Sequence, residues 1–372
     1  MPPDSPERPP HGPAYLRLPV LPPRAVAEVK WWRHLAREVK EVLGTGDPSR
    51  IRSALKAARG GFYPSTTSLY PLDGPHRSDY ISDRWRELSW VINWPAAGFL
   101  DDKLAFFFMM RHFGVPTPEV VGIVIRGRVH QLGAVEPQPA TEWMPRWVEE
   151  RGRLVVRPNR GTGGQGVLII EAGPDGGCLV NGEALSWAEL VHRFGRSVDH
   201  LITAFVEQAS YARNVFPEST NTVRILTMQD KAGQPFLAAT VHRFGTPSSA
   251  PADNFMKGGL SVPIDPETGT LGAGIQRFGL QSHDRHPITG VQLAGARVPN
   301  WPHVRDGILA AASQAAFLPF IGWDVILTED SFSVIEGNKN SDMQVYQVHR
   351  PMLPEAKIRE FYAQHGLVSA AH

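Results

Sequence analysis

Cysteine is almost missing from this sequence. Cys178 is the single one among 372 residues, which excludes an internal disulfide framework and indicates a reducing compartment. Net charge is also nearly absent, at +1, which argues against an electrostatic grip on nucleic acid. Apolar runs such as LAFFFMM are too short to span a bilayer, and no apolar signal segment is visible at the N-terminus. We therefore expect a cytoplasmic protein without a nucleic-acid or membrane partner.

The apolar content is high enough for a sizeable interior, at 42% hydrophobic residues, and the length predicts two or three lobes. The proline-rich residues 1–24 predict a disordered lead. Apolar residues spaced three and four apart predict a helical region over residues 25–100, joined by residues 101–150 to the rest. After Arg151 the chain changes to short β-branched runs separated by glycine. Strands with interspersed helices predict an α+β fold behind a helical N-terminal region.

A glycine-rich loop lies between two probable strands in LVVRPNRGTGGQGVLII, residues 154–170. The glycines match G-x-G-x-x-G, but a strand follows where a dinucleotide-binding fold needs a helix, and the Gly-Lys-Ser/Thr of a Walker A loop is absent. A strand–glycine loop–strand hairpin can close over nucleotide phosphates through its backbone N–H groups, with Arg157 as a neighbouring cation. A simple flexible hairpin is the alternative, and the segment alone does not decide between them.

Carboxylates in FIGWDVILTEDSFSVIEGN supply a second signal. Asp324 lies within an apolar strand, where an unpaired charge is costly. Glu336 and Asn338 are two apart on the next strand and so share a face. If the two strands pair, the three side chains converge, and three oxygen ligands suit Mg²⁺. A single buried Asp would favour a structural interpretation, but the full constellation downstream of a glycine hairpin favours a metal site.

Two arginines lie in other apolar strands, Arg224 in NTVRILTM and Arg243 in TVHRFG. Guanidinium groups emerging from a sheet beside a metal site suit a phosphate or a developing oxyanion. A structural salt bridge is the alternative for each.

With these residues assembled, the sequence resembles the ATP-grasp superfamily, and within it the sugar-transfer-associated ATP-grasp family, which is related to α-L-glutamate ligases. The resemblance covers about Ser78 to His365. Its motifs occur here in order as LDDKLAFFFMMRHFGVPTP, VVRPNRGTGGQGV, NTVRILT, HRFG, DNFMKGGLSVPIDPETG, HPITG, IGWDVILTED and VIEGN. The resemblance implies two α+β lobes that grip ATP: a small lobe with the glycine flap over residues 151–206 and a large lobe with the metal site over residues 207–372.

The resemblance also implies roles for individual residues. Lys103 and Arg157 would reach the nucleotide phosphates, although the superfamily usually has lysine where Arg157 stands. Arg243, with Arg224, would act on the transferring phosphoryl group or the tetrahedral intermediate. The flap over the phosphates would be Gly161, Thr162, Gly163, Gly164, Gln165 and Gly166. The adenine hinge would be Phe205, Val206, Glu207 and Gln208, although Thr203 and Ala204 stand where acidic residues are expected. The metal ligands would be Asp324, Glu336 and Asn338, holding two Mg²⁺ ions, for which Mn²⁺ can substitute.

The chemistry implied is that of an ADP-forming carboxylate–amine ligase that works through an acylphosphate, in the biosynthesis of a specialised metabolite, a peptide or a cell-envelope component. A small-molecule kinase of the same fold and a non-catalytic nucleotide-binding protein are the alternatives. The substrates would be a small carboxylate and an amine, such as an amino acid, a short peptide or a sugar acid, and the superfamily makes a homodimer plausible. The candidates for substrate contacts are Arg213, Asn221, His242, Asp253, Asn254 and Lys257.

Overall fold

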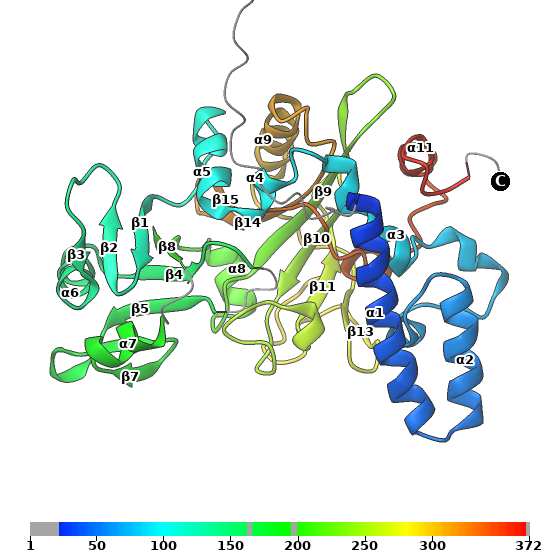
Figure 1. The fold of residues 1–372 in the computed structure, drawn as a ribbon, viewed down its shortest axis with the longest axis horizontal. Helices are drawn as coiled ribbons and strands as arrows, with labels where there is room; N and C mark the ends of the chain where they lie inside the picture. The colour runs from blue at the N-terminus through cyan, green and yellow to red at the C-terminus, as the bar shows by residue number, and fades with distance from the viewer. Residues whose placement is uncertain (1–21, 162–165, 195–198, 370–372) are drawn as a thin grey trace, which may run out of the picture.

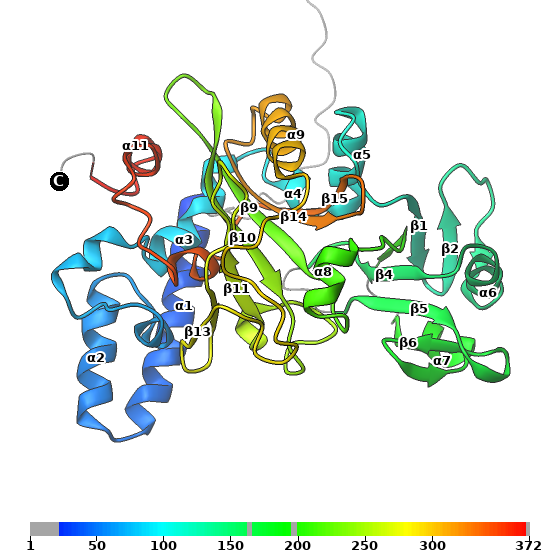
Figure 2. The ribbon, with the colours of Figure 1, turned by 180° about the vertical axis from the view of Figure 1, so that it is seen from behind.

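The computed structural model describes residues 22–161, 166–194 and 199–369. A helical N-terminal region, an eight-stranded sheet and a seven-stranded sheet make up the molecule (Figure 1). The seven-stranded sheet lies between helices α1 and α2 of the N-terminal region and the eight-stranded sheet in both views (Figures 1 and 2). This mixed helix-and-sheet architecture is the α+β fold that the sequence predicts. Of the predicted disordered lead, residues 1–21 lie outside the described residues.

The helical N-terminal region begins with two helices, of which the second is capped by a side chain. Pro48 opens α2, and the Asp47 side chain accepts hydrogen bonds from the N–H groups of Ser49 and Arg50, which satisfies donors that a helix start leaves free. The helices of this region are α1 (Pro23–Gly44), α2 (Pro48–Arg59), η1 (Pro64–Ser68), η2 (Pro75–Asp79), α3 (Asp83–Ser89), η3 (Trp90–Asn93), α4 (Gly98–Asp101) and α5 (Lys103–His112). Within the described ranges, every helix is too short or too polar to cross a membrane.

The eight-stranded sheet forms the small lobe, in the order β3-β2-β1-β8-β4-β5-β6-β7. Its strands are β1 (Val120–Ile125), β2 (Arg128–Gln131), β3 (Gln138–Pro139), β4 (Leu154–Pro158), β5 (Leu168–Ala172), β6 (Cys178–Val180), β7 (Glu183–Leu185) and β8 (His200–Ala204). Its helices are α6 (Ala140–Arg151), η4 (Pro174–Gly176) and α7 (Trp187–Arg193). The strands β1 to β3 lie within residues 101–150, the predicted linker, so the sheet of the small lobe begins before residue 151.

The seven-stranded sheet forms the large lobe, in the order β13-β12-β11-β10-β9-β14-β15. Its strands are β9 (Thr222–Gln229), β10 (Pro235–Phe244), β11 (Leu260–Pro263), β12 (Gly274–Gln276), β13 (Ser282–His283), β14 (Phe320–Leu327) and β15 (Phe332–Asn338). Its helices are α8 (Ser210–Val215), η5 (Phe255–Lys257), α9 (Trp301–Gln314), α10 (Gln344–Gln347) and α11 (Ala356–Gln364).

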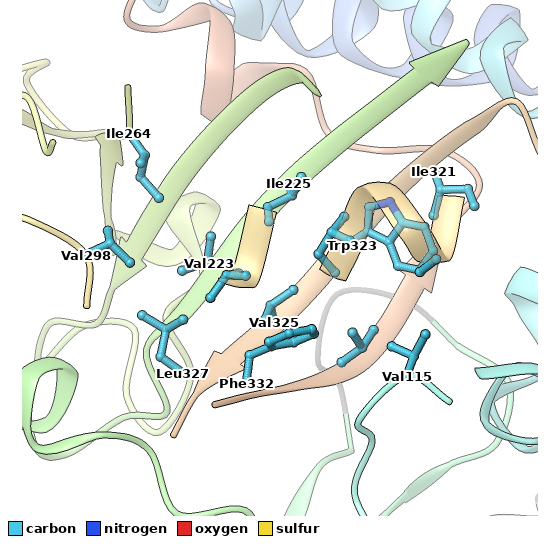
Figure 3. Close-up of a cluster of buried hydrophobic side chains, with 14 of the residues drawn as sticks. Val115, Val223, Ile225, Ile264, Val298, Ile321, Trp323, Val325, Leu327 and Phe332 are labelled. Carbon is cyan, nitrogen blue, oxygen red and sulfur yellow. The ribbon is translucent and has the colours of Figure 1, made fainter. Parts of the chain in front are cut away.

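The large sheet buries one face in the main hydrophobic core. Val223, Ile225, Trp323 and Val325 alternate along β9 and β14 and are fully buried together (Figure 3). Because successive strand residues point to opposite faces, the residues between them, Arg224 and Asp324, point to the other face. The burial of the apolar residues therefore fixes which side of the sheet carries the charged ones.

Candidate functional site

A row of charged side chains crosses the centre of the large sheet. Arg224 on β9 pairs in register with Asp324 on β14, and Asp324 pairs with Glu336 on β15. Asn338 is paired with Gly322, two residues from Asp324, so its side chain lies on the same face. The hairpin expected from the sequence thus forms, and it brings Asp324, Glu336 and Asn338 to one side of the sheet.

Asp324 is the centre of a buried ion-pair network. Its Oδ2 accepts a hydrogen bond from Arg224 Nη2 at 2.9 Å, and its Oδ1 is paired with Arg224 Nε. Arg243 Nη2 lies 3.4 Å from the same Oδ1. The Asp324 side chain is only 7% exposed, so the two arginines supply the countercharge that a buried carboxylate requires.

Arg243 is held from its other side by Asp253. The two side chains are 3.3 Å apart, and Asp253 Oδ2 accepts a hydrogen bond from the Thr222 backbone N–H at 2.7 Å. Burial raises the pKa of Asp253, and the Arg243 charge opposes that rise. Burial alone lowers the pKa of Arg243, but Asp253 and Asp324 together outweigh it and raise the pKa above its ordinary value. Arg243 is therefore a permanent cation, and Asp253 is a buried residue that positions it.

Two cations that precede the large lobe in sequence, Lys103 and Arg157, contact β15. Lys103 Nζ lies 3.4 Å from Glu336 Oε1 and donates a hydrogen bond to the Gly161 carbonyl at 2.9 Å. Arg157 on β4 donates to the Ile335 carbonyl at 3.0 Å, and its guanidinium lies 5.4 Å from the Phe107 ring centre. Burial lowers the pKa of Arg157, while Glu336 and Asp324 act in the opposite direction. The predicted phosphate-binding cations thus converge on the predicted metal strand.

The glycine loop joins β4 and β5, which pair as an antiparallel hairpin. Gly166 has φ +74°, a left-handed conformation that glycine adopts without strain. Gly161, at the other end of the loop, is the residue whose carbonyl Lys103 contacts. The remaining flap residues, Thr162, Gly163, Gly164 and Gln165, lie outside the described residues.

The predicted hinge follows β8 as an irregular segment. The Arg153 guanidinium lies 3.9 Å from the Phe205 ring centre, and Arg153 forms an ion pair with Glu207. A cavity of about 320 Å³ touches this segment, lined partly by Trp147. Val206, which lies between Phe205 and Glu207 in sequence, is half-buried.

Gln208 and Asn221 are joined in one internal hydrogen-bond network. Gln208 Oε1 accepts from the Asn221 backbone at 2.9 Å, and Asn221 Nδ2 donates to the Phe216 carbonyl at 2.7 Å. Asn221 Oδ1 accepts from the Gly245 N–H at 3.0 Å, and its side chain is fully buried. These bonds hold the segments around α8 together and engage the polar atoms of the Asn221 side chain inside the protein.

The other candidates for substrate contacts lie in different surroundings. His242 neighbours Arg243 on β10 and therefore points to the opposite face, where its ring stacks on Phe244 at 4.1 Å. Arg213 is exposed and pairs with Glu329 at 3.7 Å. Asn254 caps η5, and Lys257, at the end of η5, is exposed. Among the six candidates, Asp253 touches the arginine–carboxylate network through its ion pair with Arg243.

Tyr346 is a residue that the sequence reasoning did not single out. It is 3% exposed, and its hydroxyl lies 3.3 Å from Ser341 Oγ. Burial raises its pKa, and the charges of Arg224, Asp324 and Arg243 all act on it, so the ring lies beside the network. Because Tyr346 belongs to a four-residue helix after β15, no periodicity in the sequence could have marked it.

The donor set of β14 and β15 fits a hard divalent cation. Asp324 Oδ1 is buried and faces the guanidinium groups of Arg224 and Arg243, and the Glu336 side chain is 17% exposed. The described part of the chain contains no group of three or more His, Cys, Asp or Glu side chains placed to hold a metal. A cation bound by Asp324, Glu336 and Asn338 would therefore need further oxygens, as Mg²⁺ takes from phosphates and water.

Replacing Arg224 by glutamine is expected to tighten Mn²⁺ binding in the presence of ADP by about tenfold, or ~1.4 kcal/mol. The two-point pair with Arg224 competes with a metal for Asp324, and glutamine removes that competing charge. Electron paramagnetic resonance titration of free Mn²⁺ measures the affinity without requiring turnover. Arg350→Gln, an exposed arginine paired with Glu355, is the control and should leave the affinity unchanged. Weaker binding in Arg224→Gln would instead mean that Arg224 supports the metal ligand.

Acidification is expected to destabilise the fold through His242. Burial lowers the pKa of His242 to about 3, against about 6.5 in an unfolded chain. Because the unfolded state takes up the proton first, the stability that this residue contributes is complete above pH 6.5 and declines as the pH falls toward 3. Between pH 7 and pH 5 the wild type should lose about 2 kcal/mol more than His242→Phe. Urea unfolding of both proteins at the two pH values checks this, and equal losses would contradict it.

Comparisons with known proteins cover most of the chain. A family model described as sugar-transfer associated ATP-grasp matches residues 92–357. No curated protein matches the sequence. N5-carboxyaminoimidazole ribonucleotide synthetase from Thermotoga maritima is 13% identical, with a TM-score of 0.35, and the match covers 66% of this chain and 43% of that one.

Two further solved structures show a similar degree of likeness. D-alanine–D-alanine ligase from Bacillus anthracis is 14% identical, with a TM-score of 0.34, and the match covers 80% of this chain and 74% of that one. The ATP-grasp ligase PsnB, complexed with minimal precursor, Mg and ADP, is 13% identical, with a TM-score of 0.37, over 75% of this chain and 65% of that one. These likenesses are too distant to assign any residue a role, and the chain spans less than half the length of the Thermotoga maritima enzyme.

Proposed function

Because the chain belongs to the sugar-transfer associated ATP-grasp family, we propose that it is an ATP-dependent ligase that joins a carboxylate to an amine and releases ADP and phosphate. One observation supports this most strongly. Arg157 and Lys103 both contact β15, whose Glu336 pairs in register with Asp324 of β14. Cations that face a pair of carboxylates between two lobes suit a metal-bound polyphosphate better than any other ligand.

The nucleotide would lie between the lobes. Its phosphates would contact Lys103, Arg157 and the backbone of the glycine loop from Gly161 to Gly166. Its base would lie against the hinge from Phe205 to Gln208. Asp324, Glu336 and Asn338 would hold Mg²⁺, which neutralises phosphate charge and orients the γ-phosphate when it is bound.

In the first step, an oxygen of the substrate carboxylate attacks the γ-phosphorus and the bond to the β–γ bridging oxygen breaks, which yields an acylphosphate and ADP. In the second step, the amine attacks the acyl carbon, phosphate leaves with the electrons of the acyl–oxygen bond, and the nitrogen loses a proton. No side-chain nucleophile is required. Arg243 stabilises the negative charge on the transferring phosphoryl group, while Arg224 and Asp253 hold the network that positions it.

The alternatives differ in the product they predict. A small-molecule kinase would stop at a phosphorylated compound, and a non-catalytic protein would bind nucleotide without consuming it. Nucleotide binding alone does not require a buried carboxylate such as Asp324 with Arg224 and Arg243 paired to it. This arrangement of buried charges favours an enzyme. The substrate side stays a set of predictions: a biosynthetic pathway, a homodimer and roles for Arg213, Asn221, His242, Asp253, Asn254 and Lys257.

Trapping with hydroxylamine tests the proposal. The protein is incubated with Mg-ATP, hydroxylamine and pooled amino acids, short peptides and sugar acids, and products are identified by mass spectrometry. Hydroxylamine intercepts acylphosphates, so the proposal predicts a hydroxamate that appears together with ADP, and its mass identifies the acid. A phosphorylated product without a hydroxamate would support the kinase instead. Stabilisation by Mg-ATP with no product from any pool would favour the non-catalytic protein.

A further inference from the structure

A second cavity lies in the helical N-terminal region, in residues that precede the family match at residue 92. It measures about 440 Å³ and lies between α2, η2 and the start of α3. This volume is within the range of small-molecule sites. None of the residues that line it belongs to the arginine–carboxylate network of the large sheet.

The floor of this N-terminal pocket is aromatic. Phe62 and Tyr80 line it and are 2% and 7% exposed. The Tyr80 ring stacks on Tyr70 with centroids 4.7 Å apart, which fixes its orientation. The partly exposed Trp85 ring also lines the pocket. Rings that are held by packing and line a cavity can receive a flat or ring-shaped ligand at little entropic cost.

Arg77 supplies a cation beside that floor. It is half-buried and donates a long hydrogen bond to the Lys56 carbonyl at 3.4 Å, but among the described residues no carboxylate lies within ion-pair distance of it. The acids nearby are already engaged: Asp73 pairs with Lys56 at 3.0 Å, and Asp79 pairs with His76 at 3.0 Å.

Glycine makes room for this cation. A Cβ added to Gly60 would lie 3.2 Å from both Cδ and Nε of Arg77, closer than nearly all real contacts of that kind. Within the described ranges the Tyr80 hydroxyl has no hydrogen-bond partner. Burial, and then the Asp79 charge, raise its pKa, so it remains a donor at neutral pH. A cation and a hydroxyl donor, both without a strong acceptor, therefore border an aromatic surface.

We propose that the N-terminal pocket binds an organic anion with a ring, whose carboxylate or phosphate pairs with Arg77 and whose ring lies on Phe62, Tyr80 and Trp85. The guanidinium offers two parallel N–H donors, which match either oxyanion. The pocket is separate from the proposed ligase site, so this inference stands whether or not the chain is a ligase.

Phenyl phosphate and benzoate are the probes, with inorganic phosphate as the ring-free comparison. Binding is followed by saturation-transfer NMR and isothermal titration calorimetry, with Mg-ADP added to compete for any nucleotide site. The wild type should bind at least one ring-bearing probe more tightly than inorganic phosphate, and Arg77→Gln should weaken that binding at least tenfold. Arg52→Gln, which changes an exposed arginine of α2, is the matched control and should behave as the wild type.

Tyr80→Phe separates the hydroxyl from the ring. It should weaken binding by less than Arg77→Gln, because the stacking surface remains. Thermal unfolding of each variant establishes that it is folded before binding is compared. The proposal would be overturned if neither probe binds, if inorganic phosphate binds as tightly as phenyl phosphate, or if Arg77→Gln and Arg52→Gln have the same affinity as the wild type.

Discussion

Replacing Glu336 by glutamine is expected to reduce ATP turnover by on the order of a thousandfold, about 4 kcal/mol of transition-state stabilisation. The carboxylate stands opposite Asp324 on the paired strand, and the amide is a poor ligand for a hard cation. The fold should survive, because among the described residues Glu336 has one ion-pair contact, with Lys103 at 3.4 Å, and Lys103 keeps its hydrogen bond to the Gly161 carbonyl. ADP release in the presence of the trapped acid, together with thermal unfolding, measures both effects.

A matched control lies in the same hairpin. Asp330 is an exposed acid in the turn between β14 and β15, so Asp330→Asn removes one negative charge without touching the site and should retain full turnover. Full activity in Glu336→Gln would remove the basis for the metal assignment. Loss of activity in Asp330→Asn would show that overall charge, rather than the ligand, controls the rate.

Replacing Asp324 by asparagine is expected to abolish turnover and also to lower the free energy of unfolding by about 3 to 5 kcal/mol. Arg224 has Asp324 as its only ion-pair partner among the described residues, so the substitution leaves a buried guanidinium without a countercharge. Arg243 is less affected, because Asp253 remains 3.3 Å away. Glu336→Gln and Asp324→Asn should therefore be alike in activity and different in stability.

Urea unfolding of Asp324→Asn, Arg224→Gln and the double variant isolates the pair. The double variant should recover part of the stability lost in Asp324→Asn, since it no longer contains an unpaired buried charge. Equal stability of Asp324→Asn and the wild type would mean that the network contributes nothing to the fold.

The hairpin of β14 and β15 could be predicted from the sequence because it is local. Two apolar runs joined by a short turn pair with each other, and the spacing of Glu336 and Asn338 puts them on one face. The resemblance of motifs such as VVRPNRGTGGQGV and VIEGN to those of one family then predicted the two-lobed fold. The conformation of the flap between Gly161 and Gly166 stays a prediction, since residues 162–165 lie outside the described ranges.

The pairing of Arg224 with Asp324 could not be predicted, because it depends on β9 lying beside β14 and the two residues are 100 positions apart. Nothing local to either strand specifies that neighbour. The placement of β1 to β3 in the small sheet is a long-range outcome of the same kind: β1 pairs with β8, whose strand comes far later in the chain.

For His242, by contrast, the sequence already indicates to which face of the strand the side chain points. It adjoins Arg243 in a strand, so the alternation of side chains already places the two on opposite faces. Asn221 is different again, since its position just before an apolar strand is equally compatible with a site residue and a structural one. Its hydrogen bonds to Gln208, Phe216 and Gly245 are visible only in the folded chain.

Transfer of ¹⁸O tests the central claim most directly. The acid identified by hydroxylamine trapping is labelled with ¹⁸O in both carboxylate oxygens and incubated with Mg-ATP, the protein and an amine, and the released phosphate is analysed by mass spectrometry. A ligase that forms an acylphosphate transfers one labelled oxygen to phosphate for each amide made. Unlabelled phosphate accompanying amide formation would contradict the proposed mechanism, because it would mean that the acid oxygen never became bonded to phosphorus.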